Sequence, residues 1–127
     1  LPPNKNYPVK DIDQVKVNNY DLLVLPGGVK ALEKTRQDKR LIKFINEFYK
    51  ADKVIACICS GVQLLISAKI VKGKKIAGYY SLEDDIVNAG AIYTDKPAVI
   101  DGKIVTTAHY KDMGPWMKAV LSFFNEK

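Results

Sequence analysis

Short apolar runs alternate with amphipathic stretches along the chain, and this alternation predicts strands that are followed by helices. Continuous apolar runs at residues 21–25 and 53–59 predict buried strands, because strands covered on both faces lack polar positions. Apolar residues at helical spacing predict a helix over residues 38–50. The same criteria predict helices from just after residue 59 to about residue 72, at 81–88 and at 113–124, and short strands at 75–78 and 91–94.

The last third of the chain predicts a β-hairpin, because Asp101-Gly102 separates two extended runs within residues 99–107. The final helix has one apolar face, made of Met117, Val120, Leu121 and Phe124. Strand–helix alternation implies a parallel sheet flanked by helices. The sequence therefore predicts an α/β fold, a flavodoxin-like three-layer sandwich with a mostly parallel sheet. Its 127 residues predict one domain, 1–127, that begins with a polar loop at residues 1–8.

The amino-acid composition argues against membrane proteins and nucleic-acid-binding proteins. Apolar residues make up 47% and charged residues 27%, and no apolar run approaches the length of a membrane span. The net charge of +6 comes mostly from lysines spread along the chain, which favours a solvated surface over a nucleic-acid interface. The two cysteines, one residue apart within a predicted strand, are poorly placed for a disulfide. We therefore expect a cytoplasmic protein that binds neither nucleic acid nor membrane.

Cys59 stands where the second buried strand is expected to stop and the next helix to start. This layout is that of a nucleophile elbow, which places the side chain at the carboxyl edge of the sheet. The following helix directs free N–H groups and a positive dipole end at the thiol, and both favour the reactive thiolate. We expect Cys59 to be a nucleophile, whereas Cys57, inside the strand, is expected to be buried and inert.

Three short segments are predicted to meet at the carboxyl ends of the strands, where ligands bind in such sheets. They are Pro26-Gly27-Gly28, Cys59-Ser60-Gly61 and Thr107-Ala108-His109. A backbone N–H from Gly27 or Gly28, together with that of Ser60, would stabilise an oxyanion formed on a substrate. The alternative is that the two glycines only form a tight turn and that the Ser60 side chain only caps the helix.

His109 is the one histidine of the chain, so an imidazole base must be this residue or come from a partner chain. The alternative is an ordinary surface histidine. One histidine and two closely spaced cysteines do not make a metal ligand set, so we expect neither a metal nor another cofactor. Tyr79 and Tyr80 are candidates for lining a pocket, but the sequence leaves this open.

The chain from residue 20 to its end resembles the ThiJ/PfpI superfamily, which has the class I glutamine-amidotransferase-like fold. The resemblance rests on four blocks in the family's order, at residues 20–28, 56–65, 82–91 and 99–106. It implies a nucleophile at Cys59 and oxyanion donors at Gly28 and Ser60. It also implies a homodimer or larger assembly, and an activity drawn from peptidase, deglycase, glyoxalase, isonitrile hydratase, chaperone or oxidant-sensor functions.

Two departures from the family pattern change what is expected. Peptidase-type members place a histidine directly after the nucleophile, where this chain has Ser60, and this argues against a peptidase. The family also begins with a strand-helix-strand unit that supplies an acidic residue to the cysteine, and no such unit is found before Leu1. We therefore expect the domain of residues 1–127 to be incomplete at its amino-terminal end. The chain is then a fragment, a processed product or one part of a larger assembly in which a partner chain supplies that unit, and strand edges are exposed in its absence.

Two functions remain as hypotheses. The first is a cysteine hydrolase or lyase acting on a small carbonyl compound or a peptide, in which Cys59 attacks and His109 transfers the proton. The second is an oxidative-stress sensor or chaperone-like protein without catalytic activity, in which Cys59 is oxidised to the sulfenate or sulfinate.

Overall fold

A computed structural model describes residues 9–125, so the loop predicted at residues 1–8 lies outside the described part. Its main sheet has the strand order β1-β2-β6-β5. Strands β1 (Leu22–Leu25), β2 (Val54–Ile58) and β6 (Ile104–Thr107) run parallel, and β5 (Val99–Asp101) is antiparallel to β6. Strands β3 (Lys75–Ile76) and β4 (Ile92–Tyr93) form a separate parallel pair. The mostly parallel sheet is confirmed.

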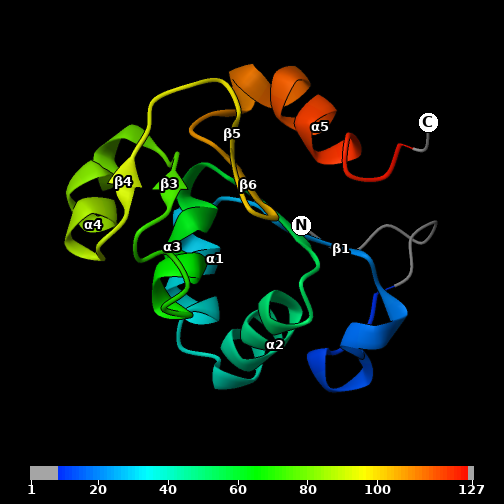
Figure 1. The fold of residues 1–127 in the computed structure, drawn as a ribbon. Coiled ribbons are helices and arrows are strands. Elements are labelled where there is room, and N and C mark those ends of the chain that lie inside the picture. Colours follow the sequence, from blue (N-terminus) through cyan, green and yellow to red (C-terminus); the bar gives the residue numbers. More distant parts are fainter. Residues whose placement is uncertain (1–8, 126–127) are drawn as a thin grey trace.

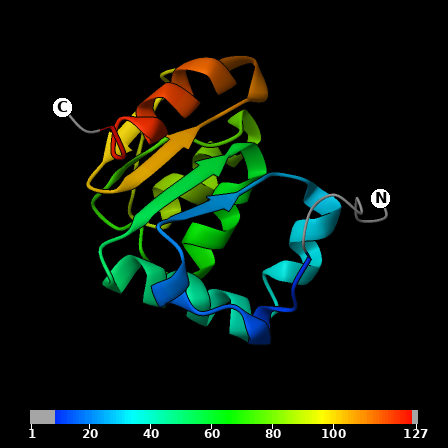
Figure 2. The same cartoon turned by 90° about the vertical axis from the view of Figure 1, so that its right-hand side faces the viewer.

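Helices cover the two faces of the main sheet, which gives three layers (Figures 1 and 2). On one face lie α1 (Val29–Thr35), α2 (Lys39–Lys50) and α3 (Val62–Ser67), whose buried residues share a large core with β1 and β2. On the other face, α5 (Met113–Leu121) packs on β2 and β6 in a smaller core. The remaining helix, α4 (Glu83–Asn88), packs against β4.

Several predicted elements are confirmed because local sequence specifies them. Asp38 caps α2 by accepting a hydrogen bond from the Arg40 N–H, as expected for a helix that begins at Lys39. The hairpin turns at Gly102, whose φ of 60° is the left-handed conformation that tight turns require. Helix α1 was not predicted, since its seven residues contain one buried apolar residue, Leu32.

Three sequence-based expectations were wrong. The helix expected to reach about residue 72 ends at Ser67, because Lys69 adopts a φ of 60° and turns Ile70 and Val71 into the core. The first strand is not fully buried, since β1 lies at an edge of the described sheet and Val24 is 43% exposed. The second strand ends at Ile58, one residue before Cys59.

The apolar face expected for the last helix was right at Val120, which is buried, and at Met117, which packs against the smaller core, but wrong at the other two residues. Leu121 and Phe124 are exposed, whereas Trp116 and Val120 are buried. The indole N–H of Trp116 donates to the carbonyl oxygen of Val105 at 3.1 Å, and this bond fixes the rotation of α5 against the sheet. A buried indole usually needs such an acceptor, and here β6 supplies it.

Thr106 connects the main sheet to the segment that follows β3. Its hydroxyl accepts a hydrogen bond of 2.8 Å from the Ala77 N–H, and both residues are buried. Thr106→Val should lower the free energy of unfolding by about 1 to 3 kcal/mol, because it leaves a buried N–H without an acceptor. Urea unfolding measures this change, and Thr106→Ser, which keeps the hydroxyl, should recover part of it. Equal stability of Thr106→Val and the native chain would contradict this role for the bond.

Candidate functional site

Cys59 lies in a sharp turn between β2 and α3. Its φ is 61°, in the left-handed region that residues with a side chain rarely occupy, and a short 3-10 turn (Cys59–Gly61) leads into α3. Ile58 and Ser60 on either side are buried, whereas Cys59 is half-buried. Backbone strain of this kind is concentrated at functional sites, and a strand-turn-helix arrangement lifts one side chain out of the sheet edge.

The Pro26-Gly27-Gly28 loop at the end of β1 packs directly against this turn. A Cβ atom added at Gly27 would lie 3.1 Å from the Cys59 Cβ, 3.3 Å from the Ser60 N and 3.5 Å from the Cys59 Sγ. The absence of a side chain at Gly27 therefore lets backbone approach the thiol closely. Gly28 is the N-cap of α1 and has a φ of 116°, a backbone conformation that favours glycine.

Gly61 packs even more tightly under the same loop. A Cβ at this position would lie 2.5 Å from the Leu25 carbonyl oxygen and 2.8 Å from that of Pro26. These contacts are too short for any side chain, so glycine is required for the end of β1 and the Cys59 turn to meet. The structure thus brings together the two loops that the sequence singled out.

Ser60 does not cap the helix, so the alternative given for its side chain from the sequence is wrong. Neither the 3-10 turn nor α3 has a side-chain cap bond. The Ser60 hydroxyl is buried and lies 3.8 Å from the Cys59 Sγ, a distance typical of a weak hydrogen bond to sulfur. Its side chain therefore contacts the thiol, which sequence reasoning missed.

Cys57 is fully buried in β2, as predicted. Burial raises the pKa of its thiol far above the ordinary value, and the neighbouring Cys59 raises it further. Cys57 is consequently protonated at neutral pH and unreactive as a nucleophile.

His109 follows β6 and is half-buried beside Tyr79, with 6.4 Å between the ring centroids. Tyr79 is in turn bound to the cysteine turn, because its N–H donates to the Cys59 carbonyl oxygen at 3.1 Å. His109 Nδ1 accepts a hydrogen bond of 3.0 Å from the Lys111 N–H. Because Nδ1 accepts this bond, the proton of the neutral ring lies on Nε2. His109 can therefore donate a hydrogen bond through Nε2 but cannot accept one there.

Two further side chains, Tyr80 and Lys111, lie beside this group of rings. Tyr80 packs on Tyr79 with 5.6 Å between centroids, and the Lys111 ammonium lies 5.7 Å from the Tyr80 ring centroid. A hydrogen bond with Tyr80 raises the pKa of Lys111, which therefore remains a cation at neutral pH. Tyr79 directly follows the strand predicted at residues 75–78, and this was the one feature of the sequence that could have predicted its position near the cysteine turn.

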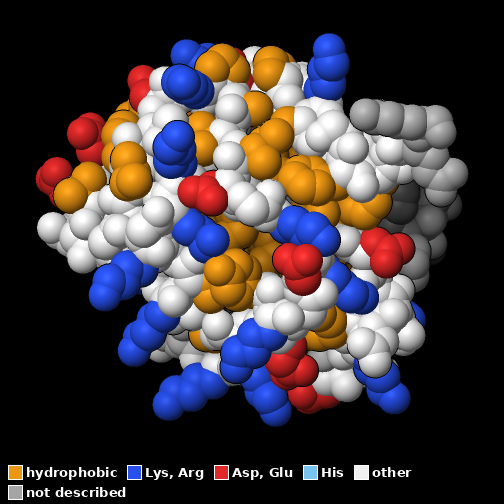
Figure 3. All heavy atoms as spheres, viewed as in Figure 1, with side chains coloured by type: hydrophobic (Ala, Val, Ile, Leu, Met, Phe, Trp, Pro, Cys, Tyr) orange, Lys and Arg blue, Asp and Glu red, His pale blue; other side chains and the backbone are white. Residues whose placement is uncertain are grey.

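Residues 9–125 contain no group of three histidine, cysteine or acidic side chains placed to hold a metal ion. No helix within this range has the length and apolar character to cross a membrane. Lysine and arginine side chains are scattered over the face in Figure 3, with acidic side chains among them.

Comparison with known proteins shows relatives of the same fold. An uncharacterised protein of Archaeoglobus fulgidus is 41% identical over 101 residues, covering 80% of this chain and 60% of the relative. Deglycase PfpI of Pyrococcus furiosus is 38% identical over 106 residues, covering 84% of this chain and 63% of the relative. The chain thus spans about three fifths of the length of these curated relatives.

Solved structures agree with the sequence comparison. The DJ-1/ThiJ/PfpI-like and ferritin-like two-domain protein of Anabaena variabilis superposes with a TM-score of 0.85 and 31% identity, covering 89% of this chain and 32% of that one. The model of the DJ-1/PfpI family matches residues 4–122, which is most of the sequence. The chain therefore belongs to the DJ-1/PfpI family.

Proposed function

We propose that this protein uses Cys59 as a nucleophile on small carbonyl compounds or on the adducts that they form with proteins, as a deglycase or glyoxalase does. The observation that carries the proposal is the strained turn at Cys59, against which Gly27 and Ser60 place backbone at close range. The name of the Pyrococcus relative, a deglycase, supports this class of substrate. The absence of a histidine at position 60 argues against a peptidase.

The chemistry begins with attack of the Cys59 thiolate on an aldehyde carbon, which forms a C–S bond and moves the carbonyl electron pair onto oxygen. The N–H groups of Gly28 and Ser60 stabilise this oxyanion, and the Nε2–H of His109 donates a further hydrogen bond to it. For a 2-oxoaldehyde, proton transfer between the two adjacent carbons gives a thioester. Water then hydrolyses the thioester to a 2-hydroxy acid and restores the thiol, with no external oxidant.

The test is to incubate the protein with methylglyoxal, and separately with a methylglyoxal-modified peptide, and to measure the lactate that is released. The proposal expects lactate from at least one of the two substrates and a transient mass adduct on the peptide that contains Cys59. Absence of lactate, together with selective addition of oxygen to Cys59 by peroxide, would contradict the enzyme and favour the sensor hypothesis.

A prediction about His109 follows from its assigned tautomer. His109→Ala should lower kcat for lactate release about tenfold to a hundredfold, because loss of one hydrogen-bond donor to an oxyanion typically costs at least this much. His109→Gln keeps a donor N–H and should lose less. The matched control is Tyr110→Ala, because Tyr110 is 69% exposed and packs on the His109 ring with 4.2 Å between centroids, so this variant removes packing on the ring while it keeps the imidazole. An unchanged kcat for His109→Ala would remove His109 from the mechanism.

A further inference from the structure

Exposed aromatic side chains border the turn that carries Cys59. Tyr79 and Tyr80 are 36% and 41% exposed, and the Tyr79 ring packs beside Tyr80 and His109 with centroid separations of 5.6 Å and 6.4 Å. The Tyr79 N–H donates to the Cys59 carbonyl oxygen, so these rings are attached to the cysteine turn. We call Tyr79, Tyr80 and His109 the aromatic rim. Aromatic side chains left exposed beside a reactive group are typical of a binding surface.

A cation is held against the aromatic rim at two points. The Lys111 ammonium lies 5.7 Å from the Tyr80 ring centroid, and the Lys111 N–H donates to His109 Nδ1 at 3.0 Å. Side chain and backbone of Lys111 therefore both contact the rim, which fixes where its positive charge lies relative to the rings. A substrate bound at Cys59 and extended across Tyr79 meets this charge.

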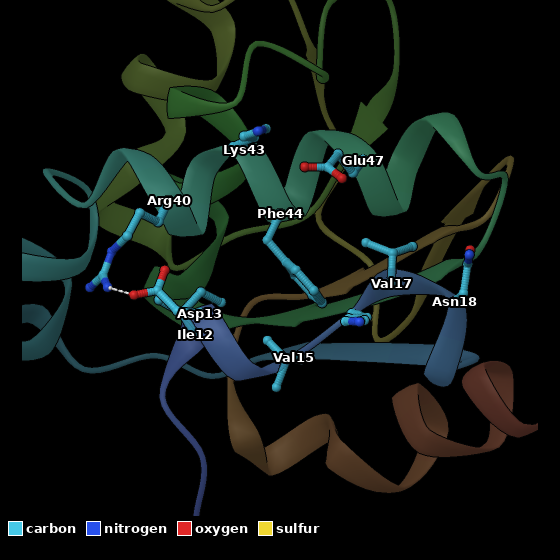
Figure 4. Close-up of a pocket in the computed structure, with 10 residues that line it drawn as sticks. Ile12, Asp13, Val15, Val17, Asn18, Arg40, Lys43, Phe44 and Glu47 are labelled. Carbon is cyan, nitrogen blue, oxygen red and sulfur yellow. Dashed lines mark hydrogen bonds and ion pairs between the residues drawn. The ribbon is translucent and has the colours of Figure 1, made fainter.

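Lys111 differs from cations that a carboxylate already neutralises. In the cavity of about 410 Å³ in Figure 4, Arg40 forms an ion pair of 2.8 Å with Asp13. Among residues 9–125, no carboxylate lies at ion-pair distance from the Lys111 ammonium. An ammonium offers several N–H donors, and the hydrogen bond with Tyr80 uses only one of them. The remaining donors are available to an anionic group of a ligand.

The acids near Lys111 decide which kind of anion it suits. Asp112 and Asp95 lie close enough for their charges to act on Lys111, although neither contacts its ammonium. Their charges repel each additional negative charge on a ligand. A carboxylate, with one negative charge, therefore suits this position, whereas a phosphate dianion does not.

We propose that Lys111 binds a carboxylate at the far end of the substrate, so that the preferred substrates of Cys59 are 2-oxoaldehydes with a carboxylate on a short alkyl tail. This inference rests on the proposed function of Cys59. The aldehyde carbon lies at the Cys59 Sγ, the tail lies along the exposed Tyr79 ring, and the carboxylate accepts hydrogen bonds from the ammonium. Proton transfer and addition of water proceed as above, so the product is a 2-hydroxy dicarboxylate.

The first measurement compares two 2-oxoaldehydes of equal length. One, 4,5-dioxopentanoate, ends in a carboxylate, and the other, 2-oxopentanal, ends in a methyl group. The native chain should have the higher kcat/KM for the carboxylate. Lys111→Met, which keeps the length of the side chain but removes its charge, should lower the ratio of the two kcat/KM values about threefold to tenfold. An equal ratio in the native chain and in Lys111→Met would overturn the proposal.

Two control variants show whether the effect belongs to the charge at this position. Lys111→Arg keeps a cation and should keep most of the preference for the carboxylate. Lys118→Met removes an exposed cation on α5 and should leave the ratio of the two kcat/KM values unchanged. An equal loss in Lys118→Met and Lys111→Met would overturn the proposal, because it would show only the effect of net charge.

The second measurement does not need turnover. Thiolates add across the double bond of maleimides, and 3-maleimidopropanoate differs from N-propylmaleimide only in ending with a carboxylate instead of a methyl group. The ratio of their rates of addition at Cys59 cancels any change in the thiolate fraction. Lys111→Met should lower this ratio about threefold or more, and added sodium chloride should lower it in the native chain. A ratio that is the same in the native chain and in Lys111→Met would overturn the proposal.

Together the two measurements separate this inference from the proposed function. If neither 2-oxoaldehyde is converted but the labelling ratio depends on Lys111, the enzyme is contradicted and the carboxylate site is retained. If both are converted and Lys111→Met lowers the two kcat/KM values equally, the enzyme is retained and the carboxylate site is overturned.

Discussion

Replacing Cys59 by alanine should lower kcat/KM for lactate release by about 10³-fold or more, since removal of a nucleophile leaves only binding and oxyanion stabilisation. The structure supports an effect of this size because Cys57, the other thiol, is buried and protonated and does not substitute for Cys59. The measurement is the initial rate of lactate release over a range of methylglyoxal concentrations.

Two control variants separate loss of the nucleophile from loss of the fold. Cys57→Ala should retain most of the activity. Cys59→Gly should be inactive but at least as stable as the native chain, because a φ of 61° costs a side-chain-bearing residue roughly 1 to 2 kcal/mol. Substantial activity in Cys59→Ala would contradict nucleophilic catalysis at this position.

Replacing Gly61 by valine should lower the free energy of unfolding by more than about 3 kcal/mol, at the upper end of what overpacking costs. Its Cβ would lie 2.5 Å from the Leu25 carbonyl oxygen and 2.8 Å from that of Pro26, and both neighbours are backbone, so neither moves without displacing β1. The Cys57 Sγ would lie 3.2 Å from the same Cβ, so the valine side chain cannot avoid the two carbonyl oxygens by shifting toward Cys57. Activity should be lost together with stability, because displacing the end of β1 also moves Gly27, which packs against Cys59.

The control for Gly61 is another glycine with free space around it. A Cβ at Gly114, in the first turn of α5, meets no atom within 4 Å. Gly114→Ala should therefore leave stability unchanged or raise it by about 0.5 to 1 kcal/mol through the lower conformational entropy of the unfolded chain. Urea unfolding of both variants compares the two sites, and a Gly61→Val protein of native stability would show that the turn can open without cost.

Part of this structure follows from local sequence alone. The apolar runs predicted β1 and β2, the helical spacing of apolar residues predicted α2, and Asp101-Gly102 predicted the hairpin, because each depends on neighbours within a few residues. The place of Cys59 between a strand and a helix was predicted in the same way. The spacing of strands and helices also predicted the mostly parallel sheet, on which the meeting of the Gly27 and Cys59 loops depends.

Other features were decided only by contacts between distant parts of the chain. The rotation of α5 depends on the bond from Trp116 to Val105, and the partial exposure of β1 depends on its place at the edge of the described sheet. The contact of the Ser60 hydroxyl with the thiol depends on the left-handed turn at Cys59, and the position of His109 beside Tyr79 depends on the packing of two separate segments. Sequence by itself thus determined most of the elements, although not α1, and where the cysteine stands. Tertiary structure decided what surrounds it, because burial and hydrogen bonding between distant segments are not encoded in any local pattern.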